Sequence, residues 1–124
     1  VLSKCTVPTY FLPKETGEKV LTGATLKNAK NNPVADCIRL FGSHNSHTGV
    51  TERFSRESWD PLTCYFALDP ENSLFKLSRG KVSMDINGVT SFVPDSSGKD
   101  YVIGLAAPAE TVQKKIDEII SEKF

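Results

Sequence analysis

The chain has 124 residues, a length typical of one domain (1–124), and its 15 basic and 15 acidic side chains cancel. Nucleic-acid binding usually needs a basic surplus, so this charge balance argues against it. No apolar run reaches the roughly 18 residues that a membrane helix requires, so we expect no membrane partner. The chain starts at Val1 without a signal peptide, which fits a processed secreted protein as well as a trimmed one.

The N-terminal segment, residues 1–17, is predicted to form an extended arm. Pro8 and Pro13 fix the backbone φ angle at two positions and remove two hydrogen-bond donors. A central strand needs those donors on both of its edges. Any strand in this arm must therefore lie at the edge of a sheet.

Four segments with β-type composition follow the arm. Segment 19–26 favours a strand in which Gly23 indicates a bulge. Segment 34–41 favours a second strand, because its side chains fit a two-residue alternation. Segment 50–59 fits a polar strand or a short helix, and we take it as a strand. Segment 62–68 is nearly all apolar, which predicts a strand covered on both faces.

The next part of the chain predicts a hairpin. Segments 74–77 and 81–86 favour strands joined by a tight turn at residues 79–80. Asn87-Gly88 then predicts a type I′ turn into a strand at 89–93, because that turn needs a positive φ at both central positions. Three apolar side chains of the first hairpin strand share one face, namely Val82, Met84 and Ile86.

The chain ends with a strand and a helix. Segment 101–105 is the last predicted strand, and Pro108 favours the start of a helix over 108–123. One apolar stripe runs along this helix, formed by Val112, Ile116, Ile119 and Ile120. Together these elements predict an α+β fold. We expect a mainly antiparallel sheet, curved or closed into a small barrel of six to eight strands, covered by the C-terminal helix.

The three cysteines, Cys5, Cys37 and Cys64, have no C-x-x-C spacing, so zinc-ribbon and thioredoxin-type sites have no support. We expect one disulfide among them, joining the Cys5 arm to one of the predicted strands, as in a secreted protein. The alternative is three buried thiols in a cytosolic protein, since free cysteine is among the most buried residue types.

The only two histidines lie close together, as His44 and His47 in an H-x-x-H pattern. Two imidazoles could share a metal ion if Glu52, Glu57 or Asp60 supplied a third ligand. Two ligands on a loop do not make a site, however. We therefore favour a solvated polar turn and expect no metal or other cofactor.

The same region holds an inventory for acid–base chemistry. His44 or His47 could exchange protons with Glu52 or Glu57 during phosphodiester cleavage, while Arg56 held the phosphate. None of these spacings is diagnostic, and a charged exposed strand or turn explains the same residues.

A different set of side chains suits protein recognition. Tyr10, Phe11 and Trp59 fall outside the regular strand faces, and together with Arg53 and Arg56 they could form a recognition patch, because Trp, Tyr and Arg dominate binding hot spots. These residues could instead cap the hydrophobic core.

Three functional hypotheses follow from these patterns. The leading one is a secreted, non-enzymatic protein that recognises another protein, such as a surface recognition module or a host-directed effector. The second is a small secreted hydrolase of ribonuclease type that uses the His44, His47, Glu52 and Glu57 inventory. The third is a carrier that holds an apolar ligand inside the predicted barrel.

Overall fold

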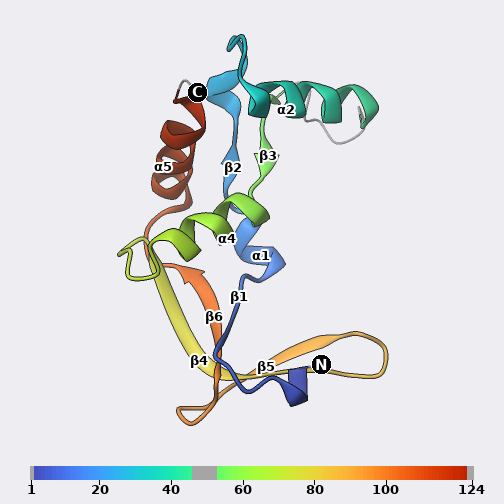
Figure 1. Ribbon diagram of the computed structural model, residues 1–124, viewed down its shortest axis with the longest axis vertical. Helices are drawn as coiled ribbons and strands as arrows, with labels where there is room; N and C mark the ends of the chain where they lie inside the picture. Colours follow the sequence, from blue (N-terminus) through green and yellow to red (C-terminus); the bar gives the residue numbers. More distant parts are fainter. Residues whose placement is uncertain (1, 46–52, 123–124) are drawn as a thin grey trace.

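The computed structural model describes residues 2–45 and 53–122. Figure 1 shows an elongated molecule, with most helices at one end and a sheet that extends to the other. The helices are α1 (Lys14–Gly17), α2 (Pro33–His44), α4 (Trp59–Leu68) and α5 (Ala109–Ser121), with 3₁₀ turns η1 (Leu2–Lys4) and η2 (Ala24–Leu26). The strands are β1 (Thr9–Phe11), β2 (Leu21–Thr22), β3 (Arg56–Glu57), β4 (Phe75–Met84), β5 (Thr90–Pro94) and β6 (Asp100–Leu105).

The strands form two separate sheets. The larger has the order β1-β6-β4-β5, in which β1 is parallel to β6 and the other neighbours are antiparallel. The smaller pairs β2 with β3 in antiparallel fashion. The predicted α+β class and C-terminal helix are confirmed. The barrel is wrong, because the described residues form only six strands and no closed sheet.

The predicted strand at 34–41 is instead the helix α2. The side chain of Asn32 caps this helix by accepting the amide of Ala35 at 3.0 Å, and Pro33 occupies the first turn. Ala35 and Ile38 are buried, which is the three-residue spacing of one helix face. The start signal Asn32-Pro33 favours this helix, and the apparent two-residue alternation was misleading.

The predicted strand at 62–68 is also helical, within α4. Pro61 lies in its first turn, and Leu62 and Phe66 are buried one turn apart. A short run that is apolar at nearly every position fits either a buried strand or a helix, so periodicity could not decide between them. The loss of these two strands explains why no barrel closes.

The predicted hairpin is confirmed as β4 and β5, but two details differ. Residues 79–80 do not turn, because β4 runs unbroken from Phe75 to Met84. The turn at Asn87-Gly88 is not of type I′, since Gly88 has a φ of 83° while Asn87 has no positive φ. Asp85 accounts for this geometry, because its carbonyl accepts the Gly88 amide at 3.2 Å and its Oδ1 accepts the amides of Asn87 and Val89.

The predicted strand at 101–105 is confirmed in full as β6, and the other strand predictions are confirmed in shortened form. In the N-terminal arm only β1 is a strand, and it lies at a sheet edge as expected, but residues 2–4 and 14–17 form η1 and α1 instead of extended backbone. Segment 19–26 keeps only β2, because Gly23 adopts a φ of 107° and starts η2 instead of forming a bulge. Residues 50–52 of the predicted strand at 50–59 lie outside the described part of the chain. Among the other residues of this segment, only β3 is a strand.

The buried apolar side chains form two clusters near the helical end. The larger brings together α4, α5, β4 and β6 and consists of Val20, Leu62, Phe66, Phe75, Ile103, Val112 and Ile116. The smaller lies under α2 and consists of Leu26, Ala35, Ile38 and Phe54. Ile120 of α5 packs against both clusters, whereas Ile119 of the predicted stripe is 48% exposed. No helix among the described residues is long and apolar enough to cross a membrane.

Candidate interaction surface

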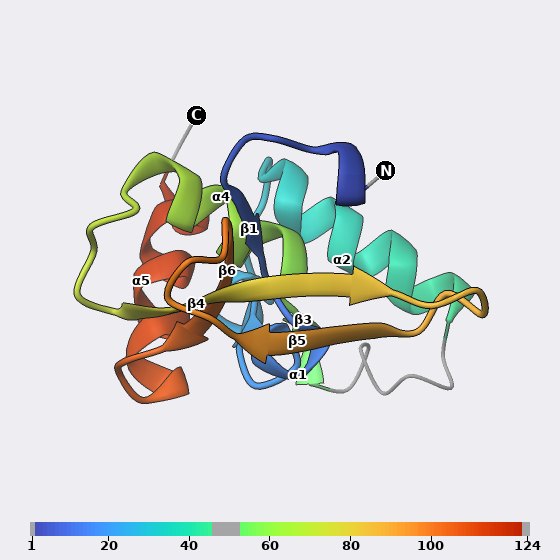
Figure 2. The ribbon, with the colours of Figure 1, turned by 90° about the horizontal axis from the view of Figure 1, so that it is seen from below.

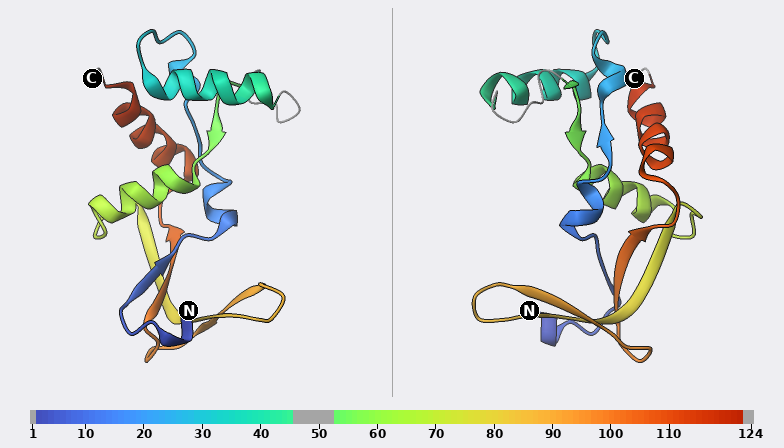
Figure 3. Two further views of the ribbon diagram at one scale, coloured as in Figure 1. Left: turned by 45° about the vertical axis from the view of Figure 1, so that its right-hand side comes forward. Right: turned by 180° about the vertical axis from the view of Figure 1, so that it is seen from behind.

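The β4–β5 hairpin extends beyond the rest of the sheet. Only the first part of β4, up to Gly80, pairs with β6, while residues 80–84 pair with β5. We call residues 80–94 the hairpin arm. Figures 1 and 3 show this arm projecting from the body at the end opposite α2 and α5, and Figure 2 shows it lengthwise.

The two faces of the arm differ in character. Strand register places Val82 opposite Phe92 and Met84 opposite Thr90, so these four side chains share one face. We call it the groove face. Together with Gly80 and Pro94, it carries no charged side chain within the paired segments of the arm. Lys81 lies on the other face and forms an ion pair with Asp95 at 2.7 Å.

The apolar side chains at the outer end of the arm are open to solvent. Met84 is 60% exposed, and Ile86 and Val89 in and beside the turn are exposed as well. The sequence pattern placed Val82, Met84 and Ile86 on one apolar face. The alternation of polar and apolar residues therefore correctly indicated a strand, but the outer two apolar side chains, Met84 and Ile86, are exposed to solvent. An exposed apolar patch of this kind commonly marks an interaction site.

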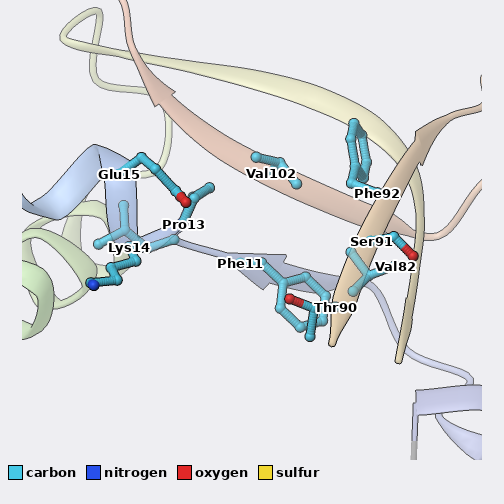
Figure 4. Close-up of a pocket in the computed structure, with 10 residues that line it drawn as sticks. Phe11, Pro13, Lys14, Glu15, Val82, Thr90, Ser91, Phe92 and Val102 are labelled. Carbon is cyan, nitrogen blue, oxygen red and sulfur yellow. The ribbon is translucent and has the colours of Figure 1, made fainter. Parts of the chain in front are cut away.

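A groove of about 380 Å³ lies at the base of the groove face. Figure 4 shows that its lining comes from β1 and α1 on one side and from the hairpin arm on the other, with Val102 of β6 between them. The lining residues are Phe11, Leu12, Pro13, Lys14, Glu15, Val82, Thr90, Ser91, Phe92 and Val102. The groove floor is therefore mostly apolar, with Lys14 and Glu15 at its α1 end.

The arm is anchored to the sheet by Asp100. Its Oδ2 accepts the Val82 amide at 2.8 Å, and its Oδ1 accepts a bond from Lys99 at 2.8 Å. The Lys99 ammonium and the Val82 amide both stabilise the carboxylate, which lowers the pKa of Asp100 despite its burial. On the other face, hydrogen bonds from Lys81 and Ser97 lower the pKa of Asp95. These bonds fix the arm where it leaves β6.

A second, smaller apolar hollow of about 160 Å³ lies between α4 and α5. It is lined by Pro61, Cys64, Tyr65, Leu68, Ile116, Ile119 and Ile120. Leu68, at the end of α4, is 84% exposed. Both this hollow and the groove face are shaped for apolar contact.

Two of the residues predicted to bind a partner lie on opposite faces of β1. Phe11 lines the groove, whereas the Tyr10 ring stacks on Tyr101 at 4.9 Å and lies near Phe66. The alternation of side chains along a strand separates these neighbours.

The other three predicted binding residues contact the body of the protein. Arg53 forms an ion pair with Glu57 at 2.8 Å. The Arg56 guanidinium lies 3.7 Å from the centre of the Phe41 ring, which joins β3 to α2. The indole of Trp59 donates a hydrogen bond to the carbonyl of Lys14 at 3.0 Å.

Of the residues proposed for acid–base chemistry, two lie outside the described part of the chain, namely His47 and Glu52. His44 is exposed at the end of α2, with its Nδ1 2.9 Å from the Leu40 carbonyl. The pKa of Glu57 is lowered by a backbone hydrogen bond and by Arg53. Within residues 2–45 and 53–122, no group of three or more His, Cys, Asp or Glu side chains could hold a metal ion.

The expected disulfide is wrong, because all three cysteines are free thiols. Cys37 and Cys64 lie on helices α2 and α4 rather than on strands, and both are exposed, which also contradicts the alternative of three buried thiols. Cys5 is half-buried and lies 3.5 Å from the Thr9 hydroxyl. This hydrogen bond lowers the pKa of the Cys5 thiol.

Comparison with protein-family models, with curated proteins and with solved structures finds no match to this chain.

Proposed function

We propose that this protein is a non-enzymatic binding protein that recognises another protein through the groove face of its hairpin arm. One observation carries the proposal, which is that a largely apolar face, with no charged side chain in its paired segments, continues from an open groove to an exposed tip. Apolar area removed from water on binding contributes roughly 25 cal/mol per Å² before the costs of association. A partner that covered this face would therefore gain affinity from Met84, Phe92 and Phe11.

The architecture of the face also suits recognition. Phe92 and Phe11 are half-buried, so they present partly ordered aromatic surfaces and lose little side-chain entropy on binding. Lys14 and Glu15 at one end of the groove supply a polar rim, the usual arrangement around an apolar interface centre.

The other two hypotheses have less support. The hydrolase would use His44 or His47 with Glu52 or Glu57, of which His47 and Glu52 lie outside the described residues, and it stays a prediction. The carrier hypothesis requires a barrel that encloses an apolar ligand. The described strands form open sheets instead, so they enclose no such cavity.

An extracellular location is part of the proposal. The three free thiols remove the support that a disulfide would have given it. The intact mass of protein taken from its native source, before and after reduction, tests this point. A loss of about two mass units relative to the reduced form indicates one disulfide and supports an oxidising compartment. Three thiols that all react with a blocking reagent count against it.

The binding proposal is tested with two hairpin variants that are matched in exposure. Met84 and Val93 are each 60% exposed, but register places Val93, opposite Lys81, on the other face of the arm. We expect Met84→Glu to lose the partners that the wild-type chain captures by cross-linking in its native surroundings. Val93→Glu should retain them. Equal loss or equal retention in the two variants would show that the groove face does not bind.

A further inference from the structure

β5 forms one free edge of the larger sheet. It is the last strand in the order β1-β6-β4-β5, and β4 is its only strand neighbour among the described residues. An edge strand presents backbone donors and acceptors with which a further strand can pair. We infer that the partner of the hairpin arm is held through an extended segment of another protein, which adds to the β5 edge as a new strand. The inference rests on the proposed function and names the form of its partner.

The strand register fixes which backbone groups of β5 face this edge. The amide of Asp85 donates to the Val89 carbonyl at 3.0 Å, at the start of the ladder between β4 and β5. In an antiparallel pair, residues that exchange backbone hydrogen bonds alternate with residues that do not. From Val89 onward, every second residue therefore directs its backbone groups to β4. The residues between them direct theirs to the free edge, and these are Thr90, Phe92 and Pro94.

The outward backbone groups are unpaired. They are the amides of Thr90 and Phe92 and the carbonyls of Thr90, Phe92 and Pro94, and no hydrogen bond joins them to any part of residues 2–45 and 53–122. Pro94 has no amide hydrogen, so it ends the row with an acceptor alone. An extended chain antiparallel to β5 carries donors and acceptors at the same spacing and can pair with all of these groups. The row therefore specifies extended backbone rather than a helix or a small apolar molecule.

β5 lacks the features that usually keep an edge strand from pairing. Proteins often block such an edge with a lysine side chain, a β-bulge or a covering element. β5 carries no charged residue, and its register with β4 is continuous from residue 90 to residue 94. The opposite edge differs, because β1 has only three residues and lies between Pro8 and Pro13. The β5 edge is therefore the one suited to the addition of a strand.

The groove face determines the side-chain pattern of the added strand. Side chains alternate between the two faces of a sheet, so every second residue of the added strand lies on the groove face beside Phe92. The Phe92 ring packs over Gly80 of β4, so it leans away from the edge and leaves it open. An apolar side chain suits this position, while the intervening ones share the face of Lys81 and meet water. We therefore expect a partner segment of about five residues that alternates apolar and polar side chains.

The first experiment measures backbone amide exchange by NMR in the full chain, alone and with peptide probes. The probes are peptides of about seven residues in which Val, Ile or Phe alternates with Ser, Thr or Lys. We expect the amides of Thr90 and Phe92 to exchange at least about tenfold more slowly with the probes than without them. The amides of Ser91 and Val93 already bond to β4 and should change little. The same peptides with methylated amides are the control and should give no protection. Probes that leave Thr90 and Phe92 unprotected would overturn the inference.

A pair of variants tests the edge without adding a charge to the groove face. Thr90→Pro removes an outward amide and leaves the hydrogen bonds between β4 and β5 in place. Thr90→Val loses the same hydroxyl but keeps the amide. We expect Thr90→Pro to weaken probe binding by about tenfold or more, and Thr90→Val to stay within a few-fold of the wild-type affinity. Circular dichroism confirms that both variants fold, and equal affinities would contradict strand addition. If Thr90→Pro does not fold, methylation of the Phe92 amide takes its place, introduced by joining synthetic residues 64–124 at Cys64.

The experiments separate this inference from the proposed function. If Met84→Glu and Thr90→Pro both lose the partners captured in the native surroundings, and Val93→Glu and Thr90→Val retain them, both the inference and the proposed function are supported. If Met84→Glu loses them and Thr90→Pro does not, the partner uses side chains of the groove face alone. The strand addition then fails and the proposed function stands. If neither Met84→Glu nor Thr90→Pro reduces capture, both fail.

Discussion

The Oδ2 atom of Asp100 accepts the backbone amide of Val82 at 2.8 Å, at the point where β4 passes the end of β6. β6 begins at Asp100, so no backbone carbonyl of that strand is available to Val82. The carboxylate takes the place of the missing strand residue and continues the ladder by one hydrogen bond. Asp100 thus sets both the end of the sheet and the beginning of the free arm.

Asp100→Ala should loosen the arm. The change leaves the Val82 amide without its acceptor and Lys99 without its partner, and an unpaired buried donor costs about 1–3 kcal/mol. We expect faster hydrogen exchange at the amide of Val82 and a matching loss in the free energy of unfolding. Asp100→Asn keeps one oxygen acceptor and should lose less. Unchanged exchange at Val82 in the alanine variant would contradict this assignment.

The arm should also weaken in acid. The pKa values of Asp95 and Asp100 are lowered in the folded protein by their hydrogen bonds from Lys81, Lys99 and neighbouring groups. A lowered folded pKa gives stability that is present above the ordinary carboxyl pKa, and this stability is lost as the pH falls below about 5. We expect the urea midpoint to fall from pH 7 to pH 3.

Asp95→Asn should flatten this pH dependence. A double-mutant cycle supplies the control, because Lys81→Met should change the slope in the wild-type background and not in the Asp95→Asn background. If Lys81→Met acts equally in both backgrounds, the ion pair is not the cause.

Gly80 is required for the packing of Phe92 on the groove face. A Cβ atom at position 80 would collide with the Phe92 ring and with the carbonyl of Val93. Gly80→Ala should therefore displace the ring and cost about 1–3 kcal/mol of unfolding free energy. The matched control is Gly104→Ala in β6, whose Cβ would meet only the flexible side chain of Lys76, at 3.1 Å. Chemical denaturation measures both variants, and equal effects would contradict the close contact at Gly80.

Asp117 connects α5 to the chain at Gly23. Its buried Oδ1 accepts the Gly23 amide at 2.8 Å, and burial raises the pKa of this carboxyl in spite of that bond. A raised folded pKa means that stability is highest below the ordinary carboxyl pKa and declines as the pH rises through it. Asp117→Asn keeps an oxygen acceptor without the desolvated charge, so we expect unchanged or higher stability at pH 7.

Asp117→Ala should behave in the opposite way. It leaves the Gly23 amide without its acceptor and should cost about 1–3 kcal/mol in thermal or chemical unfolding. An asparagine variant that is as unstable as the alanine variant would show that the charge, and not the hydrogen bond, is what the fold requires.

Local chemistry alone was sufficient for the hairpin and the C-terminal helix. Asn87-Gly88 between two β-type segments marks a reversal of the chain in nearly any context, although the side chain of Asp85 decided which turn forms. Pro108 and the spacing of the apolar residues after it specify an amphipathic helix without reference to the remaining chain. The edge position of β1 follows from its flanking prolines in the same way.

The sequence by itself therefore determined the α+β class, the hairpin and the closing helix, and it found Phe11 of the groove. Only the tertiary structure decided that 34–41 and 62–68 are helices, because short apolar runs satisfy either period until neighbouring elements cover particular side chains. The same holds for the groove face. Alternation shows that Val82 and Met84 share a side of β4, but whether that side meets a core or water depends on which elements pack against it.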